Sequence, residues 1–364
     1  MLRRTVLFTA LLVVAACSEP AADTTTTVPS TTTTSATTTA PTTSPTTTTL
    51  AVTTTTIDPS LITILPEGFR SPVNGLPPAL ETELDRRAIA VKIDNHPDAR
   101  PQSGLQEADA VIEILVEGGF TRFIAVFHDD DSEYLGPVRS VRPTDSTLVP
   151  AIPAPLVMSG GQPWIQNLAA NRGVRLIGEG SVGVFRISTR SAPHNLYANT
   201  ELVRQTADGR GYPDDAPTWL YRLGEWHVPD TPATTVTLSW SEGEVVTWTY
   251  EDGRYTRWYG AEPHEYVTAT GETGQISADV LVILAGHRYT AFPTGAGTPV
   301  PATETTGSGQ AWVISRGGVW TGTWERAAIT DQFRLLNADG TEAVVPAGIP
   351  WVSIFPEGRP ISIS

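Results

Sequence analysis

The chain has 364 residues, of which 40% are hydrophobic, with 31 Gly, 30 Pro and a formal net charge of −15. This is the composition of a globular, turn-rich protein rather than of a helical or membrane bundle. The negative charge repels nucleic-acid phosphates and anionic lipid headgroups, so the sequence predicts no nucleic-acid partner.

The first 17 residues have the features of a secretory leader. Arg3 and Arg4 precede an apolar stretch at 6–16, which is shorter than the ~20 residues that span a bilayer. Small residues end the stretch before Cys17, the only cysteine in the chain. The segment resembles the bacterial lipobox, which implies that Cys17 carries diacylglycerol and becomes the new N-terminus. The alternative is an ordinary cleaved signal in which Cys17 occurs by chance.

Residues 18–60 are rich in Thr, Ser, Ala and Pro and hold almost no large apolar side chain. Such a segment cannot bury enough surface to offset its chain entropy, so it is predicted to be a disordered tether. With acylated Cys17 in the lipid bilayer, the tether would hold a folded body at the outer face of the bacterial cytoplasmic membrane.

An N-terminal domain is predicted over 65–226, because short apolar runs alternate there with amphipathic stretches. We expect an α/β (α+β) fold with a mixed sheet. The predicted strands are 89–93, 109–117, 121–128, 156–159 and 174–177. The predicted helices are 145–151, 163–171 with Pro163 in the first turn, and 200–207 with Thr200 as the N-cap.

A smaller, mostly antiparallel β domain is predicted over 234–362, where apolar residues recur with period two. Asp252-Gly253 and Asp339-Gly340 are predicted hairpin turns, because these residues tolerate positive φ. The predicted strands are 235–240, 244–250, 255–259, 279–284, 311–315, 319–324, 333–336 and 351–355.

The first group of candidate ligand-binding residues leaves a predicted strand and enters a proline-punctuated loop. It consists of Lys92, Asp94, Asn95 and His96. Strand ends in α/β sheets commonly hold ligands. Lys92 is the only lysine in the chain. Either the site needs a compact ammonium group at this position, or the single lysine is there by chance.

A second group lies on two neighbouring strands. Glu113 and Glu117 are predicted to share one face, and a reversal at Gly118-Gly119 would bring Arg122 close to Glu117. Four residues along a strand span ~13 Å, against ~5 to 9.5 Å for the carboxyl pair of a glycosidase. The two acids therefore do not form a catalytic pair, and a salt bridge or a ligand cradle is expected instead.

A third group combines arginines with a histidine and an amide. Arg139 and Arg142 follow a Gly-Pro turn and could form a carboxylate or phosphate fork. His194 could act as an acid, a base or a hydrogen-bond donor, and the candidate Asn195 follows it in the same segment. The arginines and His194 could equally be structural, because Arg also braces loops.

Other motifs fail on their context. Residues 178–183 match GxGxxG, but 184–187 is predicted to be a strand, so no helix N-terminus would face a pyrophosphate. The acidic run at 128–131 lacks EF-hand spacing. The six histidines form no HExxH motif or close pair, and there is no GxSxG elbow. The sequence therefore predicts neither a cofactor nor a metal.

Several of these segments together resemble a known family. They are 91–105, 113–123, 136–140 and 192–197, with 307–309, 322–324 and 350–352 in the second half. These segments are similar to the bacterial lipoproteins of the YerB family, labelled domain of unknown function 3048. The resemblance implies a two-domain extracytoplasmic lipoprotein and implies no established reaction or ligand.

Three functional hypotheses follow. The leading one is a tethered accessory protein that binds a cell-wall or envelope-protein ligand through the candidate residues. The alternative is a hydrolase or transferase acting on wall polymer, with Glu113, Glu117 or Asp94 as acid or base and His194 assisting. Such an enzyme needs a carboxyl pair within ~10 Å, for example Asp94 and Glu113. In the third hypothesis the polar residues only lock the fold.

Overall fold

The computed structural model describes residues 62–63 and 68–364. The predicted leader with Cys17 and the predicted tether lie outside these residues, so both stay predictions. Within the described ranges, no helix has the length and apolar character needed to cross a bilayer.

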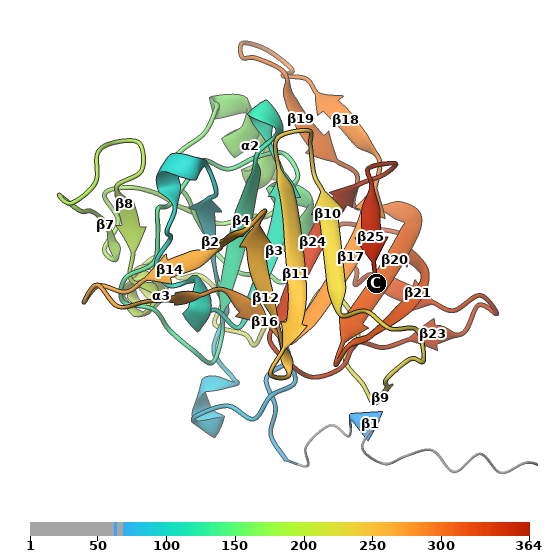
Figure 1. Ribbon diagram of the computed structural model, residues 1–364. Helices are drawn as coiled ribbons and strands as arrows, with labels where there is room; N and C mark the ends of the chain where they lie inside the picture. The colour runs from blue at the N-terminus through green and yellow to red at the C-terminus, as the bar shows by residue number, and fades with distance from the viewer. Residues whose placement is uncertain (1–61, 64–67) are drawn as a thin grey trace, which may run out of the picture. The chain divides into compact units, whose positions relative to one another are not determined.

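The central element is a mixed sheet of eleven strands (Figure 1). In spatial order its strands are β23 (Glu342–Ala343), β22 (Arg334–Leu336), β21 (Gly318–Arg326), β20 (Gly307–Ser315), β17 (Val280–Gly286), β24 (Pro350–Pro356), β3 (Ala110–Leu115), β4 (Thr121–Phe127), β2 (Ile89–Asp94), β5 (Leu156–Val157) and β6 (Leu176–Ile177).

Strand β24 lies in the middle of this sheet, parallel to both β17 and β3. All seven of its residues are buried, as expected for a strand covered on both faces. Because β24 comes from the end of the chain and β3 from its first half, strands of both predicted domains share one sheet. The boundary between 65–226 and 234–362 stays a prediction.

A second, six-stranded sheet is built from the later part of the chain. Its order is β13 (Glu262–Pro263), β12 (Arg254–Tyr259), β11 (Val245–Glu251), β10 (Thr235–Ser239) and β25 (Ile361–Ile363), with β16 (Ser277–Ala278) paired to β12. The remaining strands form two-stranded pairs: β1 (Ile62–Thr63) with β9 (Trp226–His227), β7 (Val184–Arg186) with β8 (Leu196–Ala198), β14 (Glu265–Val267) with β15 (Thr273–Gln275), and β18 (Arg288–Ala291) with β19 (Val300–Thr303).

The helices are few and short. The α-helices are α1 (Asp145–Leu148), α2 (Pro163–Asn171) and α3 (Thr200–Gly209), and the single-turn 3₁₀ helices are η2 (Glu81–Glu83), η3 (Pro97–Ala99), η4 (Leu105–Glu107), η5 (Glu117–Gly119) and η6 (Val149–Ala151). The side chain of Asn199, rather than Thr200, caps α3 by accepting a hydrogen bond from the Leu202 amide.

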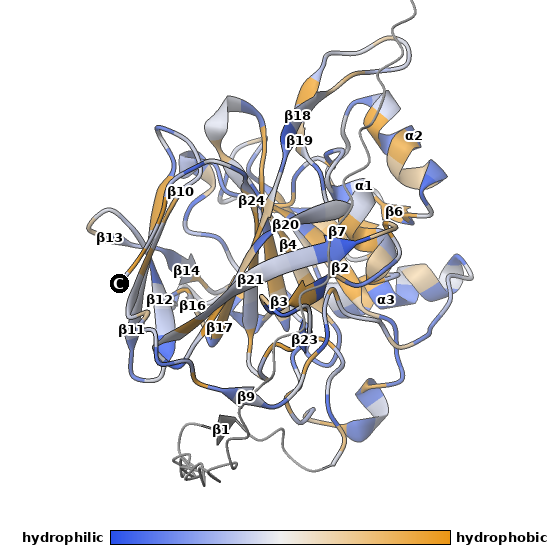
Figure 2. Ribbon diagram, turned by 90° about the vertical axis from the view of Figure 1, so that its right-hand side faces the viewer, coloured by the Kyte–Doolittle hydropathy of each residue, from blue (hydrophilic) through white to orange (hydrophobic). Residues whose placement is uncertain are grey.

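Both faces of the central strands of the large sheet are buried, each in its own core. On β3, Ile112 and Ile114 enter one core with Leu148 of α1 and Ile165 of α2. The intervening Val111 enters the other core, which holds residues of α3 and the aromatic side chains of the six-stranded sheet. In Figure 2 apolar residues gather on the central strands, such as β3. We call the two sides the α1 face and the six-stranded face.

The mixed sheet and the antiparallel character of the later strands are as predicted, and the fold as a whole is mostly β with few helices. The α/β description of the N-terminal part holds only in part, because its three α-helices have 4, 9 and 10 residues. Asp252 and Gly253 both have positive φ between β11 and β12, as a tight hairpin requires.

Candidate functional site

Three segments that are distant in the sequence meet at the end of β2. The Asp94 amide donates to Pro137 O at 2.9 Å, and the Arg139 amide donates to Lys92 O at 2.8 Å. The Val138 amide in turn donates to Leu196 O at 2.6 Å. These backbone bonds place the Arg139 and His194 loops beside Asp94.

Asp94 is the centre of a polar group that we call the Asp94 cluster: Asp94, Arg122, Arg139 and His194. Its Oδ2 accepts from Arg139 Nε at 2.8 Å and lies 2.8 Å from His194 Nδ1. Arg122 Nε lies 3.9 Å from Oδ1, because Arg122 is the register partner of Asp94 on β4. Burial opposes ionisation of Asp94, but Arg139 and Arg122 outweigh it and lower the pKa of this carboxyl.

The arginines of the Asp94 cluster are incompletely neutralised. Arg122 Nη1 donates to Ser140 O at 3.0 Å, while its buried Nε has no hydrogen-bond partner among residues 68–364. Burial and the neighbouring Arg142 lower the pKa of Arg122 to about 10. This Nε is enclosed by protein, so a ligand can reach the site only through the partly exposed side chains of Arg139 and His194.

Arg142 and Glu117 form an ion pair beside the Asp94 cluster, with 2.6 Å between Nε and Oε2. Burial opposes ionisation of Glu117, but Arg142 and the nearby Arg122 outweigh it and lower the pKa of this carboxyl. Glu117 does not share the face of Glu113 that was predicted for it, because β3 ends at Leu115 and Glu117 begins η5. The predicted reversal is present, with positive φ at Gly118 and Gly119.

His96 lies at the rim of the same site. Its side chain is 37% exposed, its ring packs edge-on against Phe120 with centroids 4.7 Å apart, and it stacks on His194 at 5.7 Å. His96 also caps η3, because its Nδ1 accepts from the Asp98 amide. Two imidazoles from distant loops therefore face one another at the surface.

Lys92 belongs to the interior. It is fully buried on the α1 face, and its Nζ lies 2.6 Å from Oδ1 of the equally buried Asp145. Burial lowers the pKa of Lys92 to about 8, although Asp145 opposes this shift. The other oxygen of Asp145 accepts from the Arg142 amide at 2.7 Å. Lys92 is thus a bridge between β2 and α1, out of reach of a ligand.

Glu113 is sealed on the six-stranded face in what we call the Glu113 network. Its Oε1 accepts from Arg257 Nη2 at 2.8 Å and from Thr121 Oγ1 at 2.7 Å, and its Oε2 accepts from Trp351 Nε1 at 2.7 Å. Both Glu113 and Arg257 are fully buried. The remaining members are Asn95, Arg100, Gln102, Glu244, Tyr259 and His264.

Asn95 joins the same sealed network. Its Nδ2 donates to Thr121 Oγ1 at 2.7 Å and to Tyr259 OH at 2.8 Å, and its Oδ1 accepts from Arg100 Nε at 3.1 Å. Asn95 follows Asp94 directly, so the alternation along the strand sends these two side chains to opposite faces of the sheet.

The same alternation separates the carboxyls proposed for an enzyme. Asp94 faces the α1 side with Arg122, whereas Glu113 faces the six-stranded side and meets Arg257. Asp94 and Glu113 therefore cannot flank one bound sugar ring.

Asn195 lies at the β7–β8 hairpin, away from these contacts. Its Oδ1 accepts from Arg186 Nη1 at 2.5 Å, and its backbone carbonyl accepts from the Ile187 amide. The GxGxxG segment at 178–183 is followed by strand β7 rather than by a helix, as predicted.

Arg257 and Arg190 hold parts of these polar groups in place, although neither is among the predicted site residues. Arg257 alternates with Tyr255 and Tyr259 on β12, so the period-two pattern already put it on the inward face. Arg190 donates to Ala99 O at 2.7 Å and to Pro101 O, which ties its loop to the loop of His96. No local pattern indicates that second contact.

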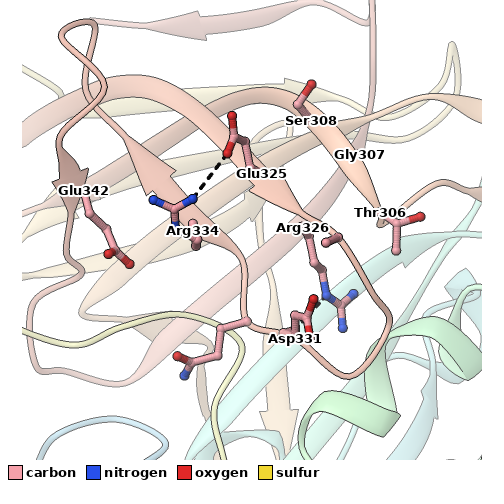
Figure 3. Close-up of a pocket in the computed structure, with 10 residues that line it drawn as sticks. Thr306, Gly307, Ser308, Glu325, Arg326, Asp331, Arg334 and Glu342 are labelled. Carbon is pink, nitrogen blue, oxygen red and sulfur yellow. Dashed lines mark hydrogen bonds and ion pairs between the residues drawn. The ribbon is translucent and has the colours of Figure 1, made fainter.

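A large hollow of about 940 Å³ lies elsewhere, and none of the candidate residues lines it (Figure 3). Arg326 stands at its wall and is held by Thr147 O at 2.9 Å and Ile329 O at 2.6 Å. Arg334 pairs with Glu325, its register partner on the neighbouring strand, at 3.5 Å. Because both arginines already have partners within the protein, we favour the Asp94 cluster over this hollow as the ligand site.

Comparison with known proteins accounts for most of the described chain. Residues 73–213 match the N-terminal domain, and residues 236–352 the C-terminal domain, of the family described as "Protein of unknown function (DUF3048)". The chain is 30% identical over 227 residues to "Putative lipoprotein YerB" of Bacillus subtilis (strain 168), which covers 60% of this chain and 68% of that relative.

A solved structure has the same fold. The crystal structure of YerB from Bacillus subtilis superposes with a TM-score of 0.68 at 24% identity, covering 81% of this chain and 100% of that chain. The chain therefore belongs to the DUF3048 family and carries both of its domains.

Proposed function

We propose that this protein is a lipid-anchored accessory protein of the cell envelope that binds an anionic ligand group at the Asp94 cluster and the adjacent Arg142. The ligand group would be a carboxylate or phosphate of a wall component. Lys92, Asn95 and Glu113 would support the fold beneath the site rather than touch the ligand, because their side chains are buried and paired.

The observation that carries this proposal is an excess of guanidinium over carboxylate in a polar group that reaches the surface through Arg139, Arg142 and His194. Arg122, Arg139 and Arg142 meet there with the two carboxylates Asp94 and Glu117, in a chain with a formal charge of −15. The side chains of Arg139 and His194 keep 21% and 16% of their surface exposed. Guanidinium groups bind carboxylate and phosphate through paired, charge-assisted hydrogen bonds.

The test is calorimetric titration of the full-length chain with anionic wall fragments, in buffer that contains a metal chelator. We expect Arg139→Ala and Arg122→Ala to weaken binding at least about tenfold, because the first removes a charge-assisted hydrogen bond and the second a neighbouring positive charge. Arg222→Ala is the matched control, since Arg222 is 66% exposed and outside the site. Flat titrations with every fragment, or equal losses in the control, would contradict the proposal.

The membrane anchor is a separate part of the proposal, supported by the leader pattern and by the lipoprotein name of the relative. Cys17→Ser is expected to abolish labelling with radioactive fatty acid and to move the protein from the membrane fraction to the soluble fraction. Retention of the variant on membranes would contradict anchoring through Cys17.

A further inference from the structure

We infer that His96, Asp98 and His194 form a binding site for a single divalent transition-metal ion, with Zn²⁺ as the probe. This goes beyond the proposed function and does not require it. One potential ligand atom from each of the three side chains lies within 4.8 Å of the other two. Two imidazoles and a carboxylate are a donor set that suits Zn²⁺ and related ions, and three protein ligands leave a coordination position open.

The orientation of His194 is the second observation. Its Nδ1 lies 2.8 Å from Oδ2 of Asp94, whose side chain is only 3% exposed. Metal-binding histidines typically hold one ring nitrogen against a carboxylate, which fixes the tautomer and leaves the other nitrogen for the ion. Asp94 would therefore be a positioning residue, and Nε2 of His194 would be the metal ligand.

The two ligand loops are held together before any ion binds. Arg190, four residues before His194, donates to the carbonyls of Ala99 and Pro101 in the loop that carries His96 and Asp98. The His96 and His194 rings stack at 5.7 Å with an angle of 25° between their planes. Side-chain rotations, together with release of His96 Nδ1 from the Asp98 amide, would bring the donor atoms to the ~3.3 Å separation of a tetrahedral Zn²⁺ site.

Charge limits how tightly the ion would bind. Arg122 and Arg139 repel a cation, whereas Asp98 and Asp94 attract it, and Asp94 already pairs with Arg139. Asp98 is free to turn toward the ion because its side chain is 74% exposed. An ion bound here would present its open position next to the guanidinium groups, where an anion could complete its coordination.

The experiment is a titration of chelator-treated full-length chain with Zn²⁺ in the absence of any wall fragment. We expect one ion per chain, with His96→Ala and His194→Ala each weakening binding more than about tenfold and Asp94→Asn by ~10–100-fold. His227→Ala is the matched control, because His227 is exposed and outside the cluster. Titration with Co²⁺ should give the visible absorption of a tetrahedral site, and His96→Ala should abolish it.

Three results would overturn the inference: no stoichiometric binding of Zn²⁺, wild-type affinity in both His96→Ala and His194→Ala, or an equal loss in His227→Ala. Thermal melts confirm that each variant is folded, and the 37% exposure of His96 makes it the safest substitution. Failure here leaves the proposed function intact, because fragment binding is measured with chelator present.

Discussion

The indole Nε1 of Trp351 donates a 2.7 Å hydrogen bond to Oε2 of Glu113, across 238 positions of the sequence. The same carboxylate accepts from Arg257, so a residue of β3 is held by one residue of β24 and one of the six-stranded sheet. Strands from both halves of the chain therefore depend on one buried charge.

Glu113→Gln should lower the free energy of unfolding by about 3–5 kcal/mol, because it leaves the guanidinium of Arg257 buried without its counter-charge. Trp351→Phe removes the hydrogen-bond donor and part of a buried ring, and should cost about 1–3 kcal/mol. The double variant should lose less than the sum, since both changes act on one network. Urea unfolding checks this, with Trp258→Phe as the control for loss of a half-buried indole donor. Additive losses would argue against a shared network.

Lys92 should make stability rise with pH in the alkaline range. Its pKa of about 8 in the folded protein lies below the ordinary 10.5, so the unfolded chain binds more protons between these values. The free energy of unfolding then increases with pH in this window, by at most about 1.4 kcal/mol per pH unit. Lys92→Met should remove this slope in urea titrations between about pH 8 and 10. Because Lys92 is the only lysine, no other lysine can produce the slope, and an unchanged slope in Lys92→Met would contradict the prediction.

Gly104 should not tolerate a side chain. Its φ is +80°, and an added Cβ would lie 2.7 Å from Ser132 Oγ and 2.9 Å from Leu135 Cα. Gly180 has a similar φ of +88° with open space around it, so Gly180→Ala reports the conformational cost alone, about 1–2 kcal/mol. Gly104→Ala should lose clearly more in thermal unfolding. Equal losses in the two variants would show that the contact with Leu135 relaxes freely.

Asn199 should account for the stability of the α3 N-terminus. Asn199→Ala removes the 3.0 Å bond from the Leu202 amide to Oδ1 and should cost about 1 kcal/mol. Asn199→Asp keeps an acceptor at the same place and should retain most of the wild-type stability in urea unfolding. If both variants lose the same amount, the cap is not the cause.

The strands and the turns were largely accessible from the sequence, because period-two alternation and residues such as Asp252-Gly253 act locally. The same alternation separates Val111 from Ile112 into the two cores. The local sequence pattern does not predict which strands become neighbours in the sheet. The position of β24 between β17 and β3 depends on parallel pairing between distant segments.

The sequence identified candidate residues for the site but not which of them lie together in the folded protein. Asp94 and Asn95 looked equivalent in the sequence, yet consecutive strand residues face opposite sides, and one of them lies in each polar group. The sealing of Glu113 depends on Arg257, which belongs to another sheet. Similarly, the approach of His96 to His194 depends on long-range contacts without a sequence motif, among them the hydrogen bond from Arg190 to Ala99 O.

The place of β24 also sets the order of assembly. A chain that emerges from its N-terminus exposes the edges of β3 and β17 until residues 350–356 arrive. Unpaired strand edges recruit other chains, and non-local parallel pairing is slow to form. The largest sheet thus closes only when β24 has paired with both neighbours, and until then the edges of β3 and β17 are open to pairing with other chains.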